Sequence, residues 1–372
     1  MPPTEARQAF LAVYSMIQTD YFKPVPGSKV VTSCLKGMFK NLDDQSAYLD
    51  KVDYDDLRST PAPDSVGIGV ELTMRAGLPV VISAKENSPA ELGGLRPKDY
   101  ILEIDGQSME GVELEEALRR LRGAAGSNVL IVTRRPGEAQ TRNMSLTRAS
   151  FRASHASSRL LPSGVGYLKV RTITADTPPE IRAEFRKLQA AKPLRGLVLD
   201  LRNAPGGPLV PVIELAAMFL KPGSLVVATE GRLPESNQAM HARRDELLKY
   251  EGAKTDPWPE EMTAVPMVVL VNAGTASGAE IIASALGDNG RAKLVGTKTF
   301  GRGIVQTIRR LSEDSAIKIT TAYYRTPSGK RIHGEGLQPD MQAPDLARLQ
   351  DAGTEKDEGL SKAVAALLQL PT

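Results

Sequence analysis

A short apolar run that leads directly into a helical pattern is the feature that most constrains the fold. Residues 267–271 read Met-Val-Val-Leu-Val and follow Pro266. A run that is short, β-branched and apolar throughout predicts a strand buried on both faces. The polar turn 272–275 comes next, and residues 276–286 then carry apolar side chains at helical spacing. This segment therefore predicts a buried strand joined by a tight turn to a helix.

The same alternation of strand and helix occurs earlier in the chain. Residues 166–170 and 197–199 are apolar enough for strands, and residues 178–191 between them have a helical pattern. Strands that alternate with helices are typical of a layered α/β core. At 372 residues, with 41% hydrophobic residues, the chain is long enough for two or three domains.

Ser277 lies where the turn meets the helix. The first helical turn has unpaired backbone N–H groups, and together with the helix dipole they stabilise negative charge. A serine that attacks an acyl group would benefit from that field. Gly206 and Gly207 follow the strand predicted at 196–201, and amides without side chains there could bind a tetrahedral oxyanion. The alternative for these glycines is an ordinary turn between strand and helix.

Five segments in a fixed order resemble the C-terminal processing, or tail-specific, serine peptidases. They are residues 196–207, 272–281, 295–306, 320–329 and 334–340. The similarity therefore covers most of the chain. It implies an α/β fold with a spiral ββα core, like that of crotonase and the Clp protease subunits, together with an inserted PDZ domain and N-terminal helices.

In that family a Ser–Lys dyad performs the chemistry, and a Gln four residues after the Lys holds the Lys side chain in place. Matched residue by residue, the resemblance puts the nucleophile at Ser277 and the positioning Gln at Gln306. The amide of Gly278 would be the second oxyanion donor, beside one of the two glycines named above. Arg302 occupies the position of the Lys. Because arginine keeps its proton at any pH that a protein meets, Arg302 cannot be the general base.

Three explanations of Arg302 stay open at this point. The chain is a natural pseudoprotease, or a Lys-to-Arg change was introduced to inactivate it, or another base substitutes. Lys298, four positions earlier, is the least favoured substitute. The three histidines, His155, His241 and His333, belong to no motif that resembles a triad, and no Gly-x-Ser-x-Gly elbow surrounds the nucleophile. Each histidine is expected to face solvent or to lie in a loop.

Two functions follow from the resemblance. The first is a PDZ-gated peptidase that cleaves unfolded or tail-exposed protein substrates near their C-termini through Ser277. The second is a pseudoprotease scaffold that binds C-terminal tails or partner proteases without cutting, and Arg302 favours it for this chain. A crotonase-type acyl-CoA enzyme is a distant third, since such chains carry no PDZ-like insertion. The resemblance also implies an adaptor or activator protein and a homodimer or larger homo-oligomer.

Residues 64–146 read as a separate unit that resembles a PDZ domain, on the segments 66–72, 88–99 and 101–106. A peptide C-terminus would add as a strand beside this domain's edge strand. Loop amides around Gly67, Ile68, Gly69 and Val70 would capture its carboxylate, and a helix at 114–121 would form the other wall. The family usually has glycine where this chain has Lys98, so the turn 97–99 is slightly atypical. The alternative is a small β-rich domain without a ligand.

These observations divide the chain into four regions. Residues 1–63 form an N-terminal helical region, 64–150 the PDZ domain, 151–345 the α/β peptidase core and 346–372 a C-terminal helical segment. Two helices are expected between residues 5 and 38, and they either mediate dimerisation or cover the core. An amphipathic helix is expected at 359–370, and it packs on a partner or on its own body.

Composition argues against several other classes of protein. The net charge is +3 and the basic residues are dispersed, so nucleic acid and membrane surfaces are not implied as partners. No apolar stretch reaches the length of a membrane span. With one cysteine, Cys34, and no His-Glu-x-x-His spacing, no metal or other cofactor is expected; Cys34 should pack as a small apolar residue in a helix. The N-terminus does not read as a signal peptide, which would fit a mature form to which Met1 was added. The family resemblance implies a location in the bacterial periplasm or cell envelope.

Overall fold

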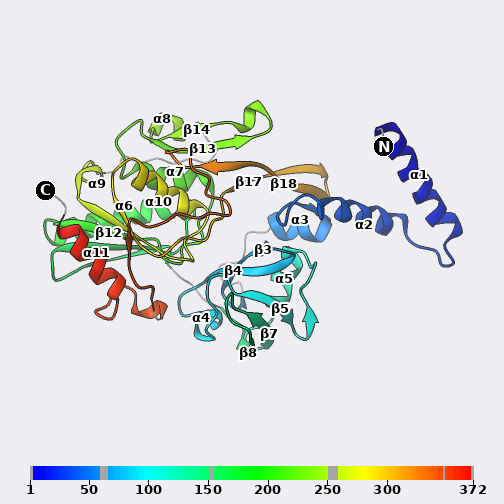
Figure 1. Cartoon of the computed structure of the whole chain (residues 1–372), viewed down its shortest axis with the longest axis horizontal. Coiled ribbons are helices and arrows are strands. Elements are labelled where there is room, and N and C mark those ends of the chain that lie inside the picture. Colours follow the sequence, from blue (N-terminus) through cyan, green and yellow to red (C-terminus); the bar gives the residue numbers. More distant parts are fainter. Residues whose placement is uncertain (1–2, 59–65, 151–153, 250–258, 347, 370–372) are drawn as a thin grey trace. The chain divides into compact units, whose positions relative to one another are not determined.

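The computed structural model describes residues 3–58, 66–150, 154–249, 259–346 and 348–369, which form two compact units (Figure 1). The first unit comprises residues 1–60 and 306–320. The second comprises residues 61–305 and 321–372, and so contains the PDZ-like segment and the predicted peptidase core apart from its residues 306–320.

The first unit is built mainly from helices. Its elements are α1 (Pro3–Asp20), α2 (Gly27–Phe39), β1 (Ala47–Leu49) and α3 (Lys51–Arg58), with the distal parts of β17 (Ile304–Ser312) and β18 (Ser315–Arg325). The two predicted N-terminal helices are therefore confirmed. Between them lies an apolar cleft of about 360 Å³, lined by residues that include Phe10, Val13 and Cys34. The side chain of Val13 remains 56% exposed within the described part of the chain, so this face is largely uncovered.

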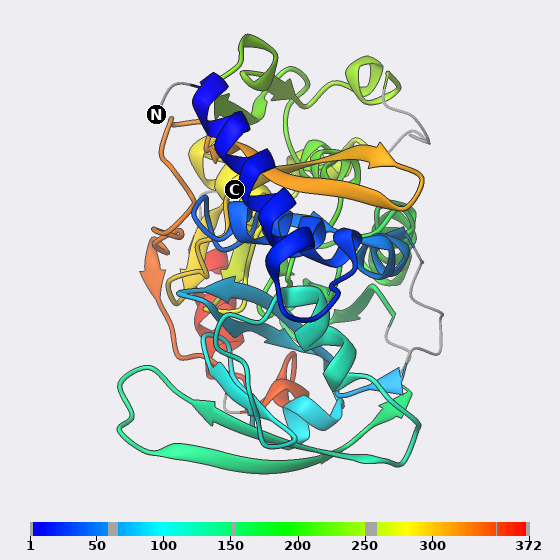
Figure 2. The same cartoon turned by 90° about the vertical axis from the view of Figure 1, so that its right-hand side faces the viewer.

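The PDZ-like segment folds around one antiparallel sheet. Its strands lie in the order β3 (Val70–Arg75), β4 (Leu78–Ala84), β5 (Tyr100–Ile104), β7 (Asn128–Arg134) and β8 (Thr141–Thr147), and β6 (Gln107–Ser108) pairs with β5. Figure 2 shows the long β7–β8 hairpin, in which Asn128 lies opposite Thr147 and Arg134 opposite Thr141. The helices α4 (Pro89–Leu92) and α5 (Leu114–Leu121) complete the segment, and β2 (Val66–Gly67) pairs with β9 (Ala149–Ser150) where it joins the rest of the chain. The helix predicted at 114–121 is confirmed.

A six-stranded sheet forms the centre of the peptidase core. Its order is β10 (Ala156–Leu160), β11 (Val165–Val170), β12 (Gly196–Asp200), β15 (Met267–Val271), β16 (Lys293–Gly296) and β19 (Met341–Gln342). All neighbouring pairs are parallel except β10 with β11. The buried strand predicted at 267–271 is β15, and the predicted strand-helix-strand segment is β11, α6 (Thr177–Ala191) and β12.

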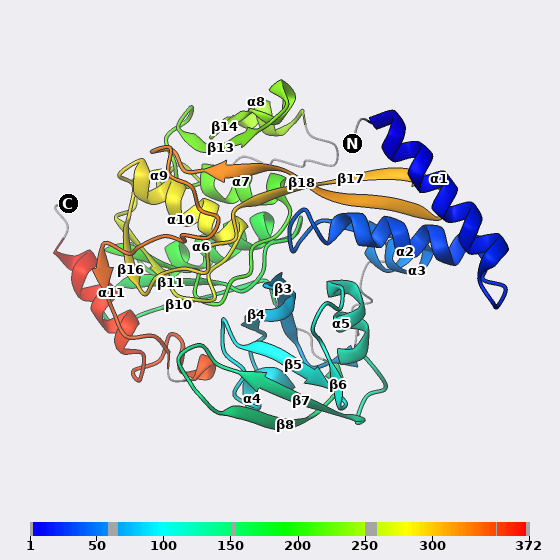
Figure 3. The same ribbon diagram turned by 45° about the vertical axis from the view of Figure 1, so that its right-hand side comes forward.

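Helices cover both faces of this sheet, as Figure 3 shows. Leu197 and Leu199 of β12 pack on one face with α6, α7 (Leu209–Ala217) and α10 (Gly278–Asp288). Val198 between them packs on the other face with α11 (Glu358–Leu368). The remaining elements of the second unit are β13 (Leu225–Gly231), η1 (Pro234–Ser236), β14 (Ala239–His241), α8 (Arg244–Leu247), α9 (Glu261–Ala264) and η2 (Leu349–Asp351).

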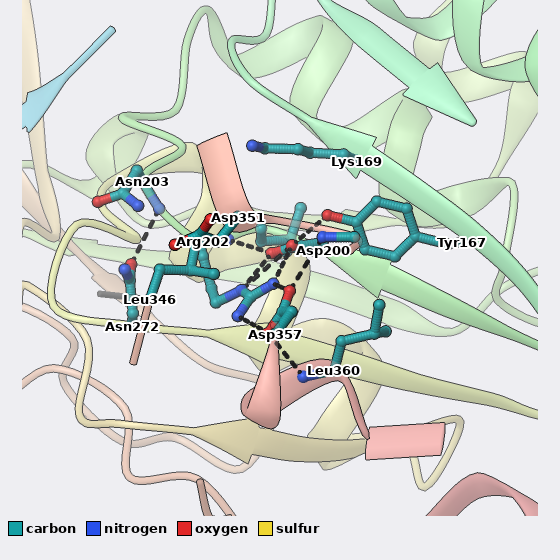
Figure 4. A network of polar contacts seen from close by, with 12 residues as sticks. Tyr167, Lys169, Asp200, Arg202, Asn203, Asn272, Leu346, Asp351, Asp357 and Leu360 are labelled. Atoms are coloured by element: carbon teal, nitrogen blue, oxygen red, sulfur yellow. Dashed lines mark hydrogen bonds and ion pairs between the residues drawn. The ribbon is translucent and has the colours of Figure 1, made fainter. Parts of the chain in front are cut away.

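A buried ion-pair network fastens α11 to the sheet (Figure 4). The guanidinium of Arg202 lies 2.6 Å from carboxylate oxygens of both Asp200 and Asp357, and the hydroxyl of Tyr167 donates to Asp200 at 2.7 Å. Burial alone would raise the pKa of Asp200, but Arg202 holds it below its ordinary value. Asp357 also caps α11 by accepting the Leu360 N–H. The C-terminal helix therefore packs on its own body, one of the two predicted alternatives.

Candidate active site

Ser277 is the residue immediately before α10, with φ +51° and ψ −118°. The sequence predicts Ser277 inside the first helical turn, whereas the structure has it as the N-cap residue that precedes the helix. A positive φ is strained for a residue with a side chain, and such strain is found at functional sites. The turn that holds it is rigid, because the Asn272 N–H donates to the Thr275 hydroxyl at 2.9 Å and the Asn272 side chain accepts the Asn203 N–H. Ser277 is thus presented on a sharp turn although no Gly-x-Ser-x-Gly sequence surrounds it.

Glu280 connects the Ser277 turn to the loop that carries Arg302. One of its carboxylate oxygens accepts the backbone N–H groups of Ser277 and Arg302, both at 2.9 Å. The other accepts the Gly301 N–H at 2.8 Å and the Thr299 hydroxyl. Burial raises the pKa of this carboxyl, and the four donors oppose that rise. Sequence reasoning missed Glu280; the available signal was its capping-box spacing from Ser277.

The predicted oxyanion glycines lie next to one another. Gly206 has φ +92°, and a Cβ added there would lie 2.4 Å from the Gly278 nitrogen. A Cβ added to Gly278 would lie 3.3 Å from the Gly207 nitrogen. Neither the Gly207 nor the Gly278 N–H donates a hydrogen bond to another described residue. Two free amides therefore lie beside the Ser277 turn, as an oxyanion hole requires.

Arg302 lies between two glycines, and its side chain is half-buried. No hydrogen bond or ion pair joins its guanidinium to another residue that the structure describes. Burial lowers the pKa of this group, and the carboxylate of Glu71 acts in the opposite direction. Because arginine remains charged even with a lowered pKa, the group is a cation without a direct partner beside the Ser277 turn.

Gln306, the predicted positioning residue, and Lys298, the least favoured substitute base, have surroundings of their own. Gln306 belongs to the first unit, where its side-chain amide donates to the Gln45 carbonyl at 2.8 Å, and its predicted contact with Arg302 stays a prediction. Lys298 is exposed, and no hydrogen bond joins it to Ser277 among the described residues.

The three histidines have neighbours of their own. His155 lies 3.1 Å from a carboxylate oxygen of Glu180, and His241 lies 3.6 Å from one of Glu246. The ring of His333 lies 5.5 Å from that of Tyr323, centroid to centroid. His333 is half-buried in the loop after β18, so the expectation of a loop position is met for it.

The PDZ-like segment packs against the Ser277 turn within the second unit. Val80 and Ile82 of β4 form a buried cluster with Ala276, the residue before Ser277, and with Phe300. The guanidinium of Arg75 lies 5.1 Å from the centroid of the Phe300 ring. Glu86 adds a second attachment through ion pairs with Lys169 at 3.3 Å and Arg171 at 2.7 Å, both in or just after β11.

The predicted peptide-binding loop lies between β2 and β3. Gly67 ends β2, Ile68 is buried, and Gly69 has the positive φ of +75° that suits glycine. Val70 of β3 and Leu118 of α5 are partly exposed apolar residues that pack on the same core. No group of His, Cys, Asp or Glu among the described residues is arranged to hold a metal ion, and no described helix meets the length and hydropathy of a membrane span.

Comparison with known proteins identifies the family. A model of peptidase family S41 matches residues 164–343, and a PDZ-domain model matches residues 80–135. The chain is 33% identical to a carboxy-terminal-processing protease of Bartonella bacilliformis, over 88% of this chain and 73% of that protein. The chain belongs to the C-terminal processing proteases of peptidase family S41.

Two further comparisons agree with this assignment. The carboxy-terminal processing protease CtpA of Bacillus subtilis is 30% identical over 92% of this chain and 70% of its own length. The solved structure of a photosystem II D1 C-terminal processing protease superposes with a TM-score of 0.76 and 28% identity, covering 92% of this chain and 86% of that one. The predicted family, fold class and PDZ insertion are therefore confirmed.

Proposed function

We propose that this S41 protease binds protein substrates that expose C-terminal tails, with Ser277 as its nucleophile, and that Arg302 in the place of the dyad lysine strongly impairs hydrolysis. One observation carries the proposal. The backbone N–H groups of Ser277 and Arg302 donate to the same oxygen of Glu280, so the two residues are neighbours although 25 positions separate them in sequence. A nucleophile and its base must be neighbours in this way.

The surroundings of Ser277 support acyl transfer. The serine hydroxyl would attack a substrate carbonyl, and the amides of Gly278 and Gly207 would donate to the oxyanion that forms. The missing step is removal of the serine proton, because a permanently charged guanidinium accepts none. Gln306, which positions the lysine in relatives, would here position Arg302.

A non-catalytic scaffold is the second candidate, and the unpaired charge of Arg302 favours it. An arginine beside the nucleophile would hold a substrate carboxylate or carbonyl without cleaving the chain. In both functions the PDZ domain would deliver the tail. The uncovered apolar face of α1 and α2 supports a homodimer as the working assembly, and the family resemblance is the basis for proposing a place in the bacterial periplasm or cell envelope.

The first test measures hydrolysis of an unfolded protein such as casein. We expect little cleavage by the unaltered chain, because general base catalysis contributes about 10²–10⁴-fold to reactions of this kind. Release of acid-soluble fragments over several hours is the measurement, with Ser277→Ala as the control. Rapid cleavage by the unaltered chain that Ser277→Ala abolishes would contradict the proposed impairment.

The second test concerns tail binding by the PDZ domain. A ten-residue peptide that ends in Val should bind the Ser277→Ala protein, and amidating its C-terminus should weaken binding at least tenfold. The reason is that loop amides around Gly67, Ile68 and Gly69 would donate to the carboxylate, and such charged hydrogen bonds contribute about 1.5–3 kcal/mol. Isothermal titration calorimetry measures both peptides. Leu118→Asp puts a charge on the apolar wall and should weaken binding of the peptide with a free carboxylate. Equal affinities for the free and the amidated peptide would show that the loop does not capture the carboxylate.

A further inference from the structure

Lys98 has a setting that the proposed function leaves unexplained. It lies in the turn between α4 and β5 with φ +73°, a conformation that suits glycine and strains residues with a side chain. Backbone hydrogen bonds hold it there: the Lys98 N–H donates to Val81 at 2.7 Å, and the Val81 N–H donates to Asp99 at 2.9 Å. A strained lysine where glycine would fit points to a use for the side chain.

The side chain of Lys98 is half-buried and makes no hydrogen bond or ion pair with another described residue. The adjacent carboxylate of Asp99 cannot neutralise it, because Asp99 pairs with Arg135 at 2.8 Å. Partial burial makes the charged form of an amine less favourable than it is in water. This combination of burial and missing partners is typical of functional amines rather than structural ones.

The turn that carries Lys98 lies against the loop that leads to Ser277. A Cβ added to Gly274 would lie 3.0 Å from Cγ of Pro97, the residue before Lys98. Val81, which is hydrogen-bonded to the turn, lies between Val80 and Ile82. These two neighbours form a buried cluster with Ala276. Glu280, whose carboxylate accepts the Ser277 N–H, is among the charged groups that act on the pKa of Lys98. The turn that carries Lys98 therefore packs beside the loop that carries Ser277.

The charged groups around Lys98 favour the neutral amine. Burial lowers the pKa of Lys98, the cations Arg75 on β3 and Lys298 after β16 lower it further, and Glu280 on α10 acts in the opposite direction. A larger fraction of this amine is therefore free to accept a proton near neutral pH than for an ordinary lysine. Arg302, by contrast, has no neutral fraction that could accept a proton near neutral pH.

We propose that Lys98 is a relocated general base that supports the residual hydrolysis at Ser277. The inference rests on the proposed role of Ser277 as nucleophile. The neutral Lys98 amine would take the proton of the Ser277 hydroxyl while the oxygen bonds to the substrate carbonyl carbon. As the tetrahedral intermediate collapses and the C–N bond breaks, the Lys98 ammonium would return that proton to the leaving amine. Water would then hydrolyse the acyl-enzyme, with the same amine as base.

The experiment compares Ser277-dependent hydrolysis in the full chain and in Lys98→Gly, with Lys293→Met as the matched lysine control. A fluorogenic peptide is followed for days, and a fluorophosphonate reports slow acylation of Ser277 by mass spectrometry. Lys98→Gly should lower both rates at least tenfold. It should leave the melting temperature unchanged or higher, since glycine relieves the strain at this φ. Lys293→Met should change the rates less than twofold, because Lys293 is an exposed lysine of β16 that pairs with Asp340.

Two further readouts separate catalysis from structure. The residual rate should rise with pH through the pKa of Lys98, and that rise should disappear in Lys98→Gly. In a Cys34→Ala background, Lys98→Cys should lose activity and regain it when bromoethylamine converts the cysteine into a lysine analogue. In an Arg302→Lys background, Lys98→Gly should change kcat/KM less than twofold, because the lysine introduced at position 302 would then supply the base.

The outcomes distinguish this inference from the proposed function. Ser277-dependent hydrolysis that survives Lys98→Gly overturns the inference and leaves Ser277 as nucleophile. Complete absence of Ser277 acylation in the unaltered chain also overturns it. If Arg302→Lys gives no Ser277-dependent activity either, the proposed function fails as well.

Discussion

Replacing Arg302 with lysine is expected to raise the hydrolysis of casein by about 10²–10⁴-fold, the contribution of a well-placed general base. Lysine can reach the same place, because the Arg302 backbone is fixed to Glu280 and not by its own side chain. Unlike arginine, a half-buried lysine without a partner can lose its proton. The measurement is kcat/KM of Arg302→Lys against the unaltered chain.

Two matched variants control this result. Arg302→Met removes the charge without adding a base and should stay as slow as the unaltered chain. Ser277→Ala in the Arg302→Lys background should lose the gained activity completely. If Arg302→Lys gains nothing although it folds with an unchanged melting temperature, position 302 does not provide the base in this chain.

Removing the carboxylate of Glu280 is expected to cost at least about 3 kcal/mol of unfolding free energy. In Glu280→Ala the N–H groups of Ser277, Gly301 and Arg302 lose their acceptor, at about 1–3 kcal/mol each. Glu280→Gln should cost less, because the amide oxygen can still accept the Ser277 and Arg302 N–H groups. The Thr299 hydroxyl can reverse its bond, so that only the Gly301 N–H loses its acceptor. Urea unfolding followed by circular dichroism gives both values.

A surface control separates local from general effects of this change. Glu261→Gln alters an exposed glutamate at the start of α9 and should change stability by less than about 0.5 kcal/mol. In an Arg302→Lys background, Glu280→Gln should also lower kcat/KM, since Glu280 holds residues 277 and 302 together. A Glu280→Ala protein as stable as the unaltered chain would show that the four hydrogen bonds do not organise this site.

Much of the fold could be predicted from the sequence because its signals are local. The apolar run 267–271 predicts a buried strand wherever it lies, and the structure has a strand with those bounds. The helix at 114–121 was implied by the resemblance to a PDZ domain, and α5 has the same bounds. The family and the PDZ insertion were predicted from several motifs that occur in a fixed order along the chain. The periodicity of a single segment could not have identified either.

The interactions that assemble the site could not be predicted in this way, because they join residues far apart in sequence. Glu280 accepts hydrogen bonds from residues 299, 301 and 302, and only a folded core brings these together. The ion pair of Arg202 with Asp357 spans 155 positions. Lys98 was visible only as a departure from glycine in a turn, and its importance depends on which surface that turn contacts. The positive φ of Ser277 depends on the packing of both neighbouring loops.

The most direct measurement of the central claim is the site and rate of labelling by a fluorophosphonate in the unaltered chain and in Arg302→Lys. Peptide mapping by mass spectrometry identifies the modified residue, and the second-order rate constant reports how strongly that residue is activated. The account predicts a single adduct on Ser277 that forms at least about 10²-fold faster in Arg302→Lys. An adduct on a different serine, or equal rates in the two proteins, would contradict it.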